Sequence, residues 1–486
     1  MYHLGGSHHR RSRQRRWSQQ FRRAALALAY ALSVCLGAGS AVAQGIPIIR
    51  DTEIERLLED YARPILRAAG LEQQNIRMRI VNHRAFNAFV MDGGNIFIHT
   101  GALMSAATPN EVIGVIAHES GHIARADIAA LQAGIRRAGQ QQLLLSLLGI
   151  GLMVAGGITG SDSGPELGSL GSATLKGGES VVIHDLLRLR RQQESGADQA
   201  GFAYLTKSGQ SGRGMLKVFE RLAGGRALSA NEQYLLSHPT EAARLMQLRE
   251  LVERSPFADR RDPPELQLRH DLVRAKLLGF TAPGEVAQVY PAADGSLSAR
   301  YARAIAKNCA GRCARAIEDV DALIREMPAN PYFWELKGEL LYRDGKRREA
   351  ETPLREAIRL LDGKAPQIQA LLARALVEAG DPALLPRAIE LGEKALLQEQ
   401  EDALLYRTLA TAYDGVRRVG EALLMSAEAC LLGGNAARAH VFAKRAQVAL
   451  AQGPADRQRS LEAKRTRAAD IVITTQAADG KADGAC

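Results

Sequence analysis

The residues best suited to chemistry are two histidines four positions apart, His118 and His122, with Glu119 directly after the first. If this stretch is helical, positions i and i+4 share a face, so both imidazoles can bind one metal ion. Glu119 is then rotated by about 100° from His118, which keeps its carboxylate off the metal but within reach of a water beside it. The pattern predicts a hydrolytic zinc site; the simpler alternative is two buried histidines in an apolar helix.

A third ligand is predicted downstream, where Glu194 and Asp198 lie four residues apart in another helical stretch. Glu194 can complete a zinc site of two histidines and one glutamate whose fourth position stays open to water. Asp198 can accept the N–H of a liganding histidine and so fix its orientation. The alternative is an exposed acidic face that pairs with the arginines just before it.

His238 precedes Pro239 and stands just ahead of a helical stretch that contains Arg244. One interpretation is a cap at the start of that helix. A second brings His238 to the metal or to the developing oxyanion, with Arg244 bracing the site. As a fourth metal ligand, His238 would displace the water and keep the enzyme latent.

The elements that must position these residues can be read from the pattern. Residues 51–70 predict an amphipathic helix, "IRMRIV" a strand, and "NAFVMDGGNIFIHTG" a hairpin. The metal-binding helix should begin at Thr108, with Glu111 three residues later closing a capping box.

Several short motifs follow one another in an order that resembles the zinc endopeptidases related to HtpX and to the prenyl-protein (CAAX) endopeptidases. They are Asn87-Ala88-Phe89, Gly93-Gly94, His118 to His122, Glu194 to Asp198, and Ser237-His238-Pro239. The resemblance implies a gluzincin, in which His118, His122 and Glu194 bind one Zn²⁺ per chain and Glu119 is the general base. One departure is "ARAD" after the second histidine, and we assign this stretch no catalytic role.

From about residue 298 the chain changes to an alanine- and leucine-rich, repetitive pattern. Trp334, Gly338 and Ala350 have the spacing of a tetratricopeptide unit, which later residues repeat. The fold class predicted is mainly α: a gluzincin-type domain with a small β-hairpin or sheet, then a helical tetratricopeptide solenoid, against a generic helical bundle. The predicted divisions are a signal peptide (1–43), a zinc metallopeptidase domain (44–290), a tetratricopeptide domain (298–450) and a flexible tail (451–486).

The first 43 residues combine a basic run, a short apolar run and small residues at Ala41 and Ala43, which predicts secretion with cleavage near Ala43. Without the seven arginines of this leader, the 63 basic residues fall to 56 against 53 acidic ones, a net charge of +3. A nucleic-acid partner is therefore not expected. The apolar segment 143–158 leaves peripheral membrane contact open, and a disulfide between Cys309 and Cys313 is about as plausible as two separate thiols.

An exported protease of this kind, joined to tetratricopeptide repeats, resembles the bacterial periplasmic β-barrel assembly-enhancing proteases. The resemblance implies a periplasmic zinc endopeptidase that degrades unfolded or stalled outer-membrane and envelope proteins and assists their assembly, with the repeats contacting the assembly machinery. The alternative is a latent or non-proteolytic chaperone or adapter of that machinery, in which the zinc is structural.

Overall fold

A computed structural model shows how the chain folds. The residues that it describes are 46–91, 94–127, 129–130, 133, 177–224, 238, 242–309, 313–453 and 458–476. The expected signal peptide (1–43) and the apolar segment 143–158 lie outside the described residues.

The N-terminal part of the fold combines one long helix with a four-stranded sheet. Helix α2 spans Thr52–Ala68, and the strands are β1 (Ile48–Ile49), β2 (Arg77–Val81), β3 (Ala88–Val90) and β4 (Asn95–His99). The strand order is β1-β2-β4-β3, with β2 and β4 parallel and the two outer pairs antiparallel. The predicted helix, strand and hairpin are all confirmed, but the sequence did not predict β1 or the parallel pairing.

The sheet is held by an apolar core that it shares with α2 and with α4 (Pro109–Ala124). Alternate residues of β2 and β4, such as Ile80, Ile96 and Ile98, are almost fully buried in one cluster with α2. Phe89 of β3 stacks on Phe97 of β4, with ring centroids 5.0 Å apart. This packing fixes β3 beside α4, the helix that carries the two histidines.

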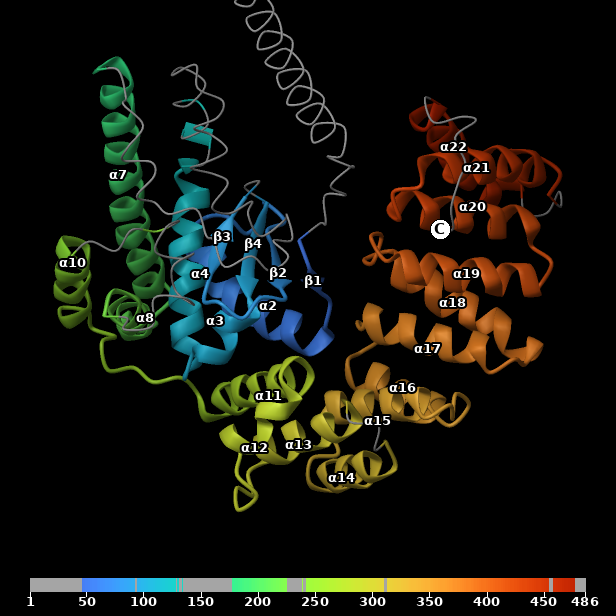
Figure 1. Cartoon of the computed structure of the whole chain (residues 1–486), viewed down its shortest axis with the longest axis horizontal. Helices are drawn as coiled ribbons and strands as arrows, with labels where there is room; N and C mark the ends of the chain where they lie inside the picture. The colour runs from blue at the N-terminus through green and yellow to red at the C-terminus, as the bar shows by residue number, and fades with distance from the viewer. Residues whose placement is uncertain are drawn as a thin grey trace, which may run out of the picture. The chain divides into compact units, whose positions relative to one another are not determined.

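Helices α4 (Pro109–Ala124) and α7 (Gly177–Lys207) lie side by side (Figure 1). Their backbones come close because glycines stand at the contact: a Cβ on Gly121 would lie 2.8 Å from the carbonyl oxygen of Ala197. A Cβ on Gly201 would lie 2.9 Å from the carbonyl carbon of Ala117. Larger residues would push the helices apart, so these glycines set the distance between the two helices that carry the predicted metal ligands.

The start of α4 differs from the expected capping box. Thr108 is the N-cap residue, as predicted, but its side chain makes no capping hydrogen bond. The carboxylate of Glu111 is buried and accepts hydrogen bonds from Lys217 and Arg221 of α8 (Arg213–Ala223), each at 2.8 Å. The capping box is therefore wrong, because tertiary ion pairs take the carboxylate that the local motif would use.

Further helices complete the structure, and most consecutive ones pack against each other. They are α3 (Thr100–Ser105), α10 (Ala242–Glu253), α11 (Pro264–Thr281), α12 (Val286–Val289), α13 (Leu297–Cys309), α14 (Cys313–Glu326), α15 (Pro331–Arg343), α16 (Glu351–Leu360), α17 (Pro366–Glu378), α18 (Leu385–Leu396), α19 (Ala403–Gly415), α20 (Val419–Leu432), α21 (Ala436–Ala451) and α22 (Gln458–Thr474).

The helices from α13 onward are packed through small and apolar residues. One core cluster joins α11 to α13, α14 and α15, and so crosses the division expected between residues 290 and 298. The expected flexible tail (451–486) is wrong for α22, because Leu461, Ala468 and Ile471 are buried in a core cluster shared with α19, α20 and α21. The polar composition of this segment concealed one apolar face.

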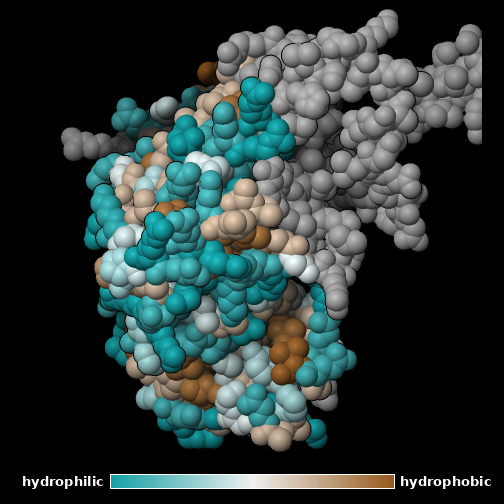
Figure 2. All heavy atoms as spheres, turned by 90° about the vertical axis from the view of Figure 1, so that its left-hand side faces the viewer, coloured by the Kyte–Doolittle hydropathy of each residue, from teal (hydrophilic) through white to brown (hydrophobic). Residues whose placement is uncertain are grey.

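The described structure confirms a mainly α fold with a small sheet. None of the described helices is long and apolar enough to span a membrane. On the face that carries α7, α8 and α10, hydrophilic side chains predominate and hydrophobic ones form small separate groups (Figure 2). The side chain of Cys309 lies outside the described part of the structure, so a disulfide between Cys309 and Cys313 stays an open alternative.

Candidate metal centre

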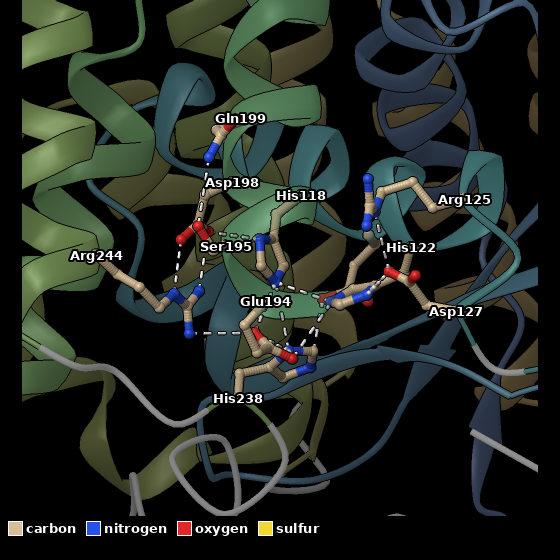
Figure 3. Close-up of polar contacts among 11 residues, drawn as sticks. His118, His122, Arg125, Asp127, Glu194, Ser195, Asp198, Gln199, His238 and Arg244 are labelled. Carbon is tan, nitrogen blue, oxygen red and sulfur yellow. Dashed lines mark hydrogen bonds and ion pairs between the residues drawn. The ribbon is translucent and has the colours of Figure 1, made fainter. Parts of the chain in front are cut away.

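Four side chains from three separate segments meet beside the α4–α7 contact. His118 and His122 come from α4, Glu194 comes from α7, and His238 lies shortly before α10. All four are buried, and one ligand atom of each lies within 4.8 Å of the others. Figure 3 shows the three imidazoles and the carboxylate facing one another.

The spacing of these atoms fits a four-coordinate metal ion. His118 Nε2 lies 3.2 Å from His122 Nε2 and 3.3 Å from His238 Nδ1. The Glu194 oxygens lie 3.1 Å from His238 Nδ1 and 3.5 Å from the Nε2 atoms of His118 and His122. Zinc bonds of 2.0–2.1 Å in a tetrahedron separate neighbouring ligand atoms by about 3.3–3.4 Å. The closest pairs among these atoms therefore match the ligand spacing of a zinc site.

Glu119 stands next to this cluster with its carboxylate unsatisfied. Its side chain is 1 % exposed, and neither oxygen has a hydrogen-bond partner among the described residues. The Nε2 atom of His238 lies 3.7 Å from Glu119 Oε1. A buried carboxylate without hydrogen bonds is costly, so this position suits a group that gains its partner from a bound water or substrate.

Asp198 and Arg244 hold the first histidine and the glutamate in place. Asp198 Oδ1 lies 3.0 Å from His118 Nδ1, the contact that the sequence predicts. The Arg244 guanidinium donates to both Asp198 oxygens, at 2.7 and 2.9 Å, and lies 3.2 Å from Glu194. This two-pronged contact fixes both carboxylates relative to α10.

The electrostatics of the cluster keep its carboxylates ionised. Burial alone would raise the pKa of Glu194, but His238, His122 and His118 hold it well below its ordinary value. Burial would likewise raise the pKa of Asp198, yet His118 and Arg244 lower it. Burial would lower the pKa of His118, but Asp198 and Glu194 raise it to about 10. The site thus attracts positive charge, and a metal ion would take the place of the imidazole proton.

Asp127 is a site residue that the sequence analysis missed. Its Oδ2 lies 3.0 Å from His122 Nδ1, so it orients the second histidine as Asp198 orients the first. Ala126 has φ of +53°, which turns the chain back after α4, and Gln193 donates to the Asp127 carbonyl at 2.8 Å. In the sequence, Asp127 is the acid five residues after His122, in the "ARAD" stretch. If the helix continued through this stretch, its side chain would point away from His122.

The structure brings the seven sequence-predicted side chains into one buried group: His118, Glu119, His122, Glu194, Asp198, His238 and Arg244. The Nδ1 atom of the His238 ring faces Glu194 and the Nε2 atom of His118. This is the position that a fourth ligand of a metal ion held by these residues would take. Three nitrogens and a carboxylate around one point, with an unpaired carboxylate beside them, can bind a metal ion and remove a proton from water.

Known proteins with similar sequences are named as proteases or metalloproteases. Residues 49–252 match peptidase family M48. The β-barrel assembly-enhancing protease of Yersinia pestis is 25 % identical over 408 residues, which cover 81 % of this chain and 79 % of that protein. Its counterpart in Escherichia coli (strain K12) is 24 % identical over 80 % of this chain and 78 % of that protein. The metalloprotease LoiP of the same bacterium is 31 % identical over 39 % of this chain and 70 % of LoiP.

Proposed function

This chain belongs to peptidase family M48 and is a metalloendopeptidase, and we propose that it is a periplasmic zinc enzyme of outer-membrane quality control. In this proposal it cleaves misassembled outer-membrane and envelope proteins and assists their assembly. The observation that carries the proposal is the group of four ligand atoms within 4.8 Å of one another, next to the unsatisfied carboxylate of Glu119.

Zinc is the metal proposed because of the donor set. Imidazole nitrogens together with one carboxylate in a tetrahedral arrangement are typical of zinc, whereas magnesium and calcium prefer six or more oxygens. His118, His122 and Glu194 would hold the ion. When bound, zinc would polarise the peptide carbonyl and activate a water molecule.

Glu119 is proposed as the general base. Its carboxylate stands within reach of the site, is buried, and has no hydrogen bond that would hold it in another role. It would take the proton from the attacking water and pass it to the leaving amine. Asp198, Asp127 and Arg244 would act through other residues: the two aspartates orient the histidines, and the arginine holds Asp198 and Glu194.

His238 is proposed as a fourth zinc ligand that keeps the resting enzyme latent. Its Nδ1 atom stands 3.1 Å from the Glu194 oxygens and 3.3 Å from His118 Nε2, at the spacing of a ligand. In that position it would occupy the place of the catalytic water, and a substrate or partner would have to displace it. The same observation favours the second candidate function, a chaperone or adapter with a structural zinc closed by four protein ligands.

The proposed location and substrates rest on three supports. The relatives that match about four-fifths of this chain are named for assembly of β-barrels. The first 43 residues have the pattern of a secretory signal. Cys430 is disulfide-bonded, and disulfides persist mainly in oxidising compartments such as the periplasm. The helices from α13 to α22 are proposed to be tetratricopeptide repeats that contact the outer-membrane assembly machinery.

The decisive experiment compares zinc content and casein cleavage in the purified wild type and in Glu119→Gln. We expect about one zinc per chain in both proteins and cleavage only in the wild type, because the variant keeps the ligands and loses the base. Cleavage by Glu119→Gln at the wild-type rate would overturn the proposed mechanism. Zinc in the wild type without cleavage of casein or unfolded envelope proteins would favour the structural-zinc alternative.

A further inference from the structure

A cleft of about 460 Å³ lies between strand β1 and helices α17 and α19. It is lined by both apolar and charged side chains. The apolar ones used below are Ile48, Leu371 and Leu404, and the charged ones are Arg50, Arg374, Glu399, Glu401 and Asp402.

One wall of this cleft is the edge of the sheet. Strand β1 pairs with β2 through Ile48 and Ile49, and no strand pairs with its other side in the described part of the chain. Ile48 is 37 % exposed, and Leu404 on the facing helix is 41 % exposed. An edge strand beside exposed apolar side chains can add an extended segment of another polypeptide.

Most charges in the cleft are already paired. Arg50 forms ion pairs with Glu55 at 2.7 Å and with Glu399 at 2.6 Å. Glu401 lies 3.6 Å from Arg79, and the Asp402 side chain caps the start of α19. These groups keep each other satisfied without a ligand.

Arg374, unlike these paired charges, has no acidic partner among the described residues. No ion pair joins its guanidinium to a carboxylate among the described residues, and its Nε atom is buried without a hydrogen-bond partner. The group lies over the Tyr342 ring, 4.9 Å from the centroid, and Arg347 lies over the same ring at 5.5 Å. The nearby carboxylate of Glu378 accepts from Arg347 at 2.9 Å and from the Tyr342 hydroxyl at 2.7 Å. Glu378 is thus taken by Arg347, and Arg374 has no carboxylate of its own among the described residues.

We propose that this cleft binds the C-terminal end of an extended polypeptide. The backbone of the bound segment pairs with β1, its apolar side chains contact Leu371 and Leu404, and its terminal carboxylate forms an ion pair with Arg374. A chain end fits better than a continuous strand because β1 offers only two residues for pairing. A terminal carboxylate supplies the missing anion whatever the side chains of the segment are.

This inference goes beyond the proposed function, because it assigns a binding site away from the metal and needs no cleavage. It gives the protein a way to recognise the ends of extended chains that are rich in β-forming residues. If the peptide does not bind, the expected results for zinc content and casein cleavage stay the same. If zinc binding or casein cleavage fails, the expected peptide binding stays the same.

The test measures peptide binding to the full chain that carries Glu119→Gln, so that the peptide stays intact. The probe is a fluorescein-labelled octapeptide that alternates threonine and valine and ends in a free carboxylate. We expect saturable binding by fluorescence anisotropy, and about 10-fold to 100-fold weaker binding of the same peptide as its C-terminal amide, because a charge-assisted contact is lost. Equal binding of acid and amide, or no binding of the acid, would overturn the proposal.

Two variants locate the contact. Arg374→Gln should weaken binding of the acid by about 10-fold to 100-fold and leave binding of the amide unchanged. Arg407→Gln is the matched control: it removes the same charge from an exposed residue of α19 that does not line the cleft, and should leave both affinities unchanged. A peptide with N-methyl groups on alternate residues should bind weakly. Full affinity of that peptide would exclude strand pairing, and an unchanged affinity in Arg374→Gln would exclude the arginine.

Discussion

In the described part of the chain, two buried clusters of charge are neutralised in different ways. The histidine cluster consists of His118, His122, Glu194 and His238, next to the carboxylate of Glu119. The lysine cluster consists of Lys276, Asp51, Glu53, Glu335 and Tyr301, and joins α2 to α11, α13 and α15. The first leaves the Glu119 carboxylate without a hydrogen bond, whereas the second contains its own cation.

The cation of the lysine cluster comes from the chain itself. Lys276 is 4 % exposed, and its Nζ atom lies 2.7 Å from Asp51, 3.2 Å from Glu53 and 3.6 Å from Glu335. The hydroxyl of Tyr301 donates to Glu53 at 3.0 Å. Burial raises the pKa of Glu335 to about 8, even though Lys276 acts to lower it, so this acid is largely protonated at neutral pH.

The contrast shows which buried charges need an external ligand. A cluster that supplies its own cation is a structural element, and its loss should reduce stability. A cluster with several donors converging on one point and an unpaired acid beside them is built to receive a cation. The two predictions with the largest expected effects remove the cation, or its ligand, from each cluster.

The largest effect is expected for His118→Ala. Loss of one imidazole should remove the metal and reduce cleavage of casein by more than about 10³-fold, since proton transfer and charge stabilisation depend on the same ion. Zinc content and initial rates measure it. His440→Ala is a matched control, because His440 is a buried histidine in α21, outside the histidine cluster. Zinc bound at one per chain by His118→Ala would contradict the assigned ligand set.

Lys276→Met should reduce the free energy of unfolding by about 3–5 kcal/mol, because it leaves buried carboxylates without their cation. The rate of cleavage per folded molecule and the zinc content should not change, since the lysine cluster is separate from the proposed metal ligands. Urea unfolding and zinc analysis measure the two effects. A variant that stayed as stable as wild type but lost zinc would mean that the two clusters are coupled.

The two clusters also differ in how well the sequence predicts them. The histidine cluster depends on short spacings: four residues between His118 and His122, and four between Glu194 and Asp198. Helical periodicity turns such spacings into a shared face, so these side chains could be predicted to lie together before the fold was known. The residues of the lysine cluster span positions 51 to 335, and no local pattern connects them.

The remaining errors have the same physical origin. Asp127 was missed because the positive φ of Ala126 ends the helical periodicity on which the prediction depended. The capping box failed because Lys217 and Arg221, about a hundred residues away, take the carboxylate of Glu111. α22 was missed because its packed face has few apolar residues within a polar segment. Element type follows from local sequence here, whereas tertiary partners do not.

Asp127→Asn tests the orienting role that the sequence did not reveal. The amide should still fit, but it would stabilise the wrong form of the His122 ring, and zinc affinity should fall by about 10-fold to 100-fold. Competition with a chelator measures it. Asp259→Asn is a suitable control, because the Asp259 side chain is 90 % exposed and lies outside the cluster. An unchanged zinc affinity in Asp127→Asn would make the contact with His122 merely structural.

His238→Ala decides what the fourth donor of the histidine cluster does. If His238 is a removable zinc ligand, the variant should cleave casein several-fold faster at rest, perform self-cleavage and lose little zinc affinity. If it stabilises the oxyanion instead, turnover should fall by roughly 10²–10³-fold with no rise in resting activity. We expect the increase, because His238 Nδ1 stands at ligand spacing from Glu194 and His118. The sign of the change in resting rate decides between the two.

The smallest effect is expected at a further buried acid, Glu399, which pairs with the partly exposed Arg50. Burial raises the pKa of Glu399 to about 7, although Arg50 acts to lower it. The folded state therefore holds the proton more tightly than the unfolded chain, and this group's contribution to stability decreases as the pH rises from about 4.5 to about 7. Glu399 thus resembles Glu335 of the lysine cluster: burial raises the pKa of the acid by more than the neighbouring cation lowers it.

Glu399→Gln should remove this decrease in stability with rising pH, because the amide does not titrate. The melting temperature of the variant, relative to wild type, should be higher at pH 8 than at pH 5, by an amount worth less than about 1 kcal/mol because the partner Arg50 is partly exposed. Glu401→Gln serves as the control, since the Glu401 side chain is 70 % exposed. If wild type instead gained stability over Glu399→Gln between pH 5 and pH 8, the attraction of Arg50 would exceed the cost of burying the charge. A cation from within the chain would then fully neutralise this acid, as zinc is proposed to do in the histidine cluster.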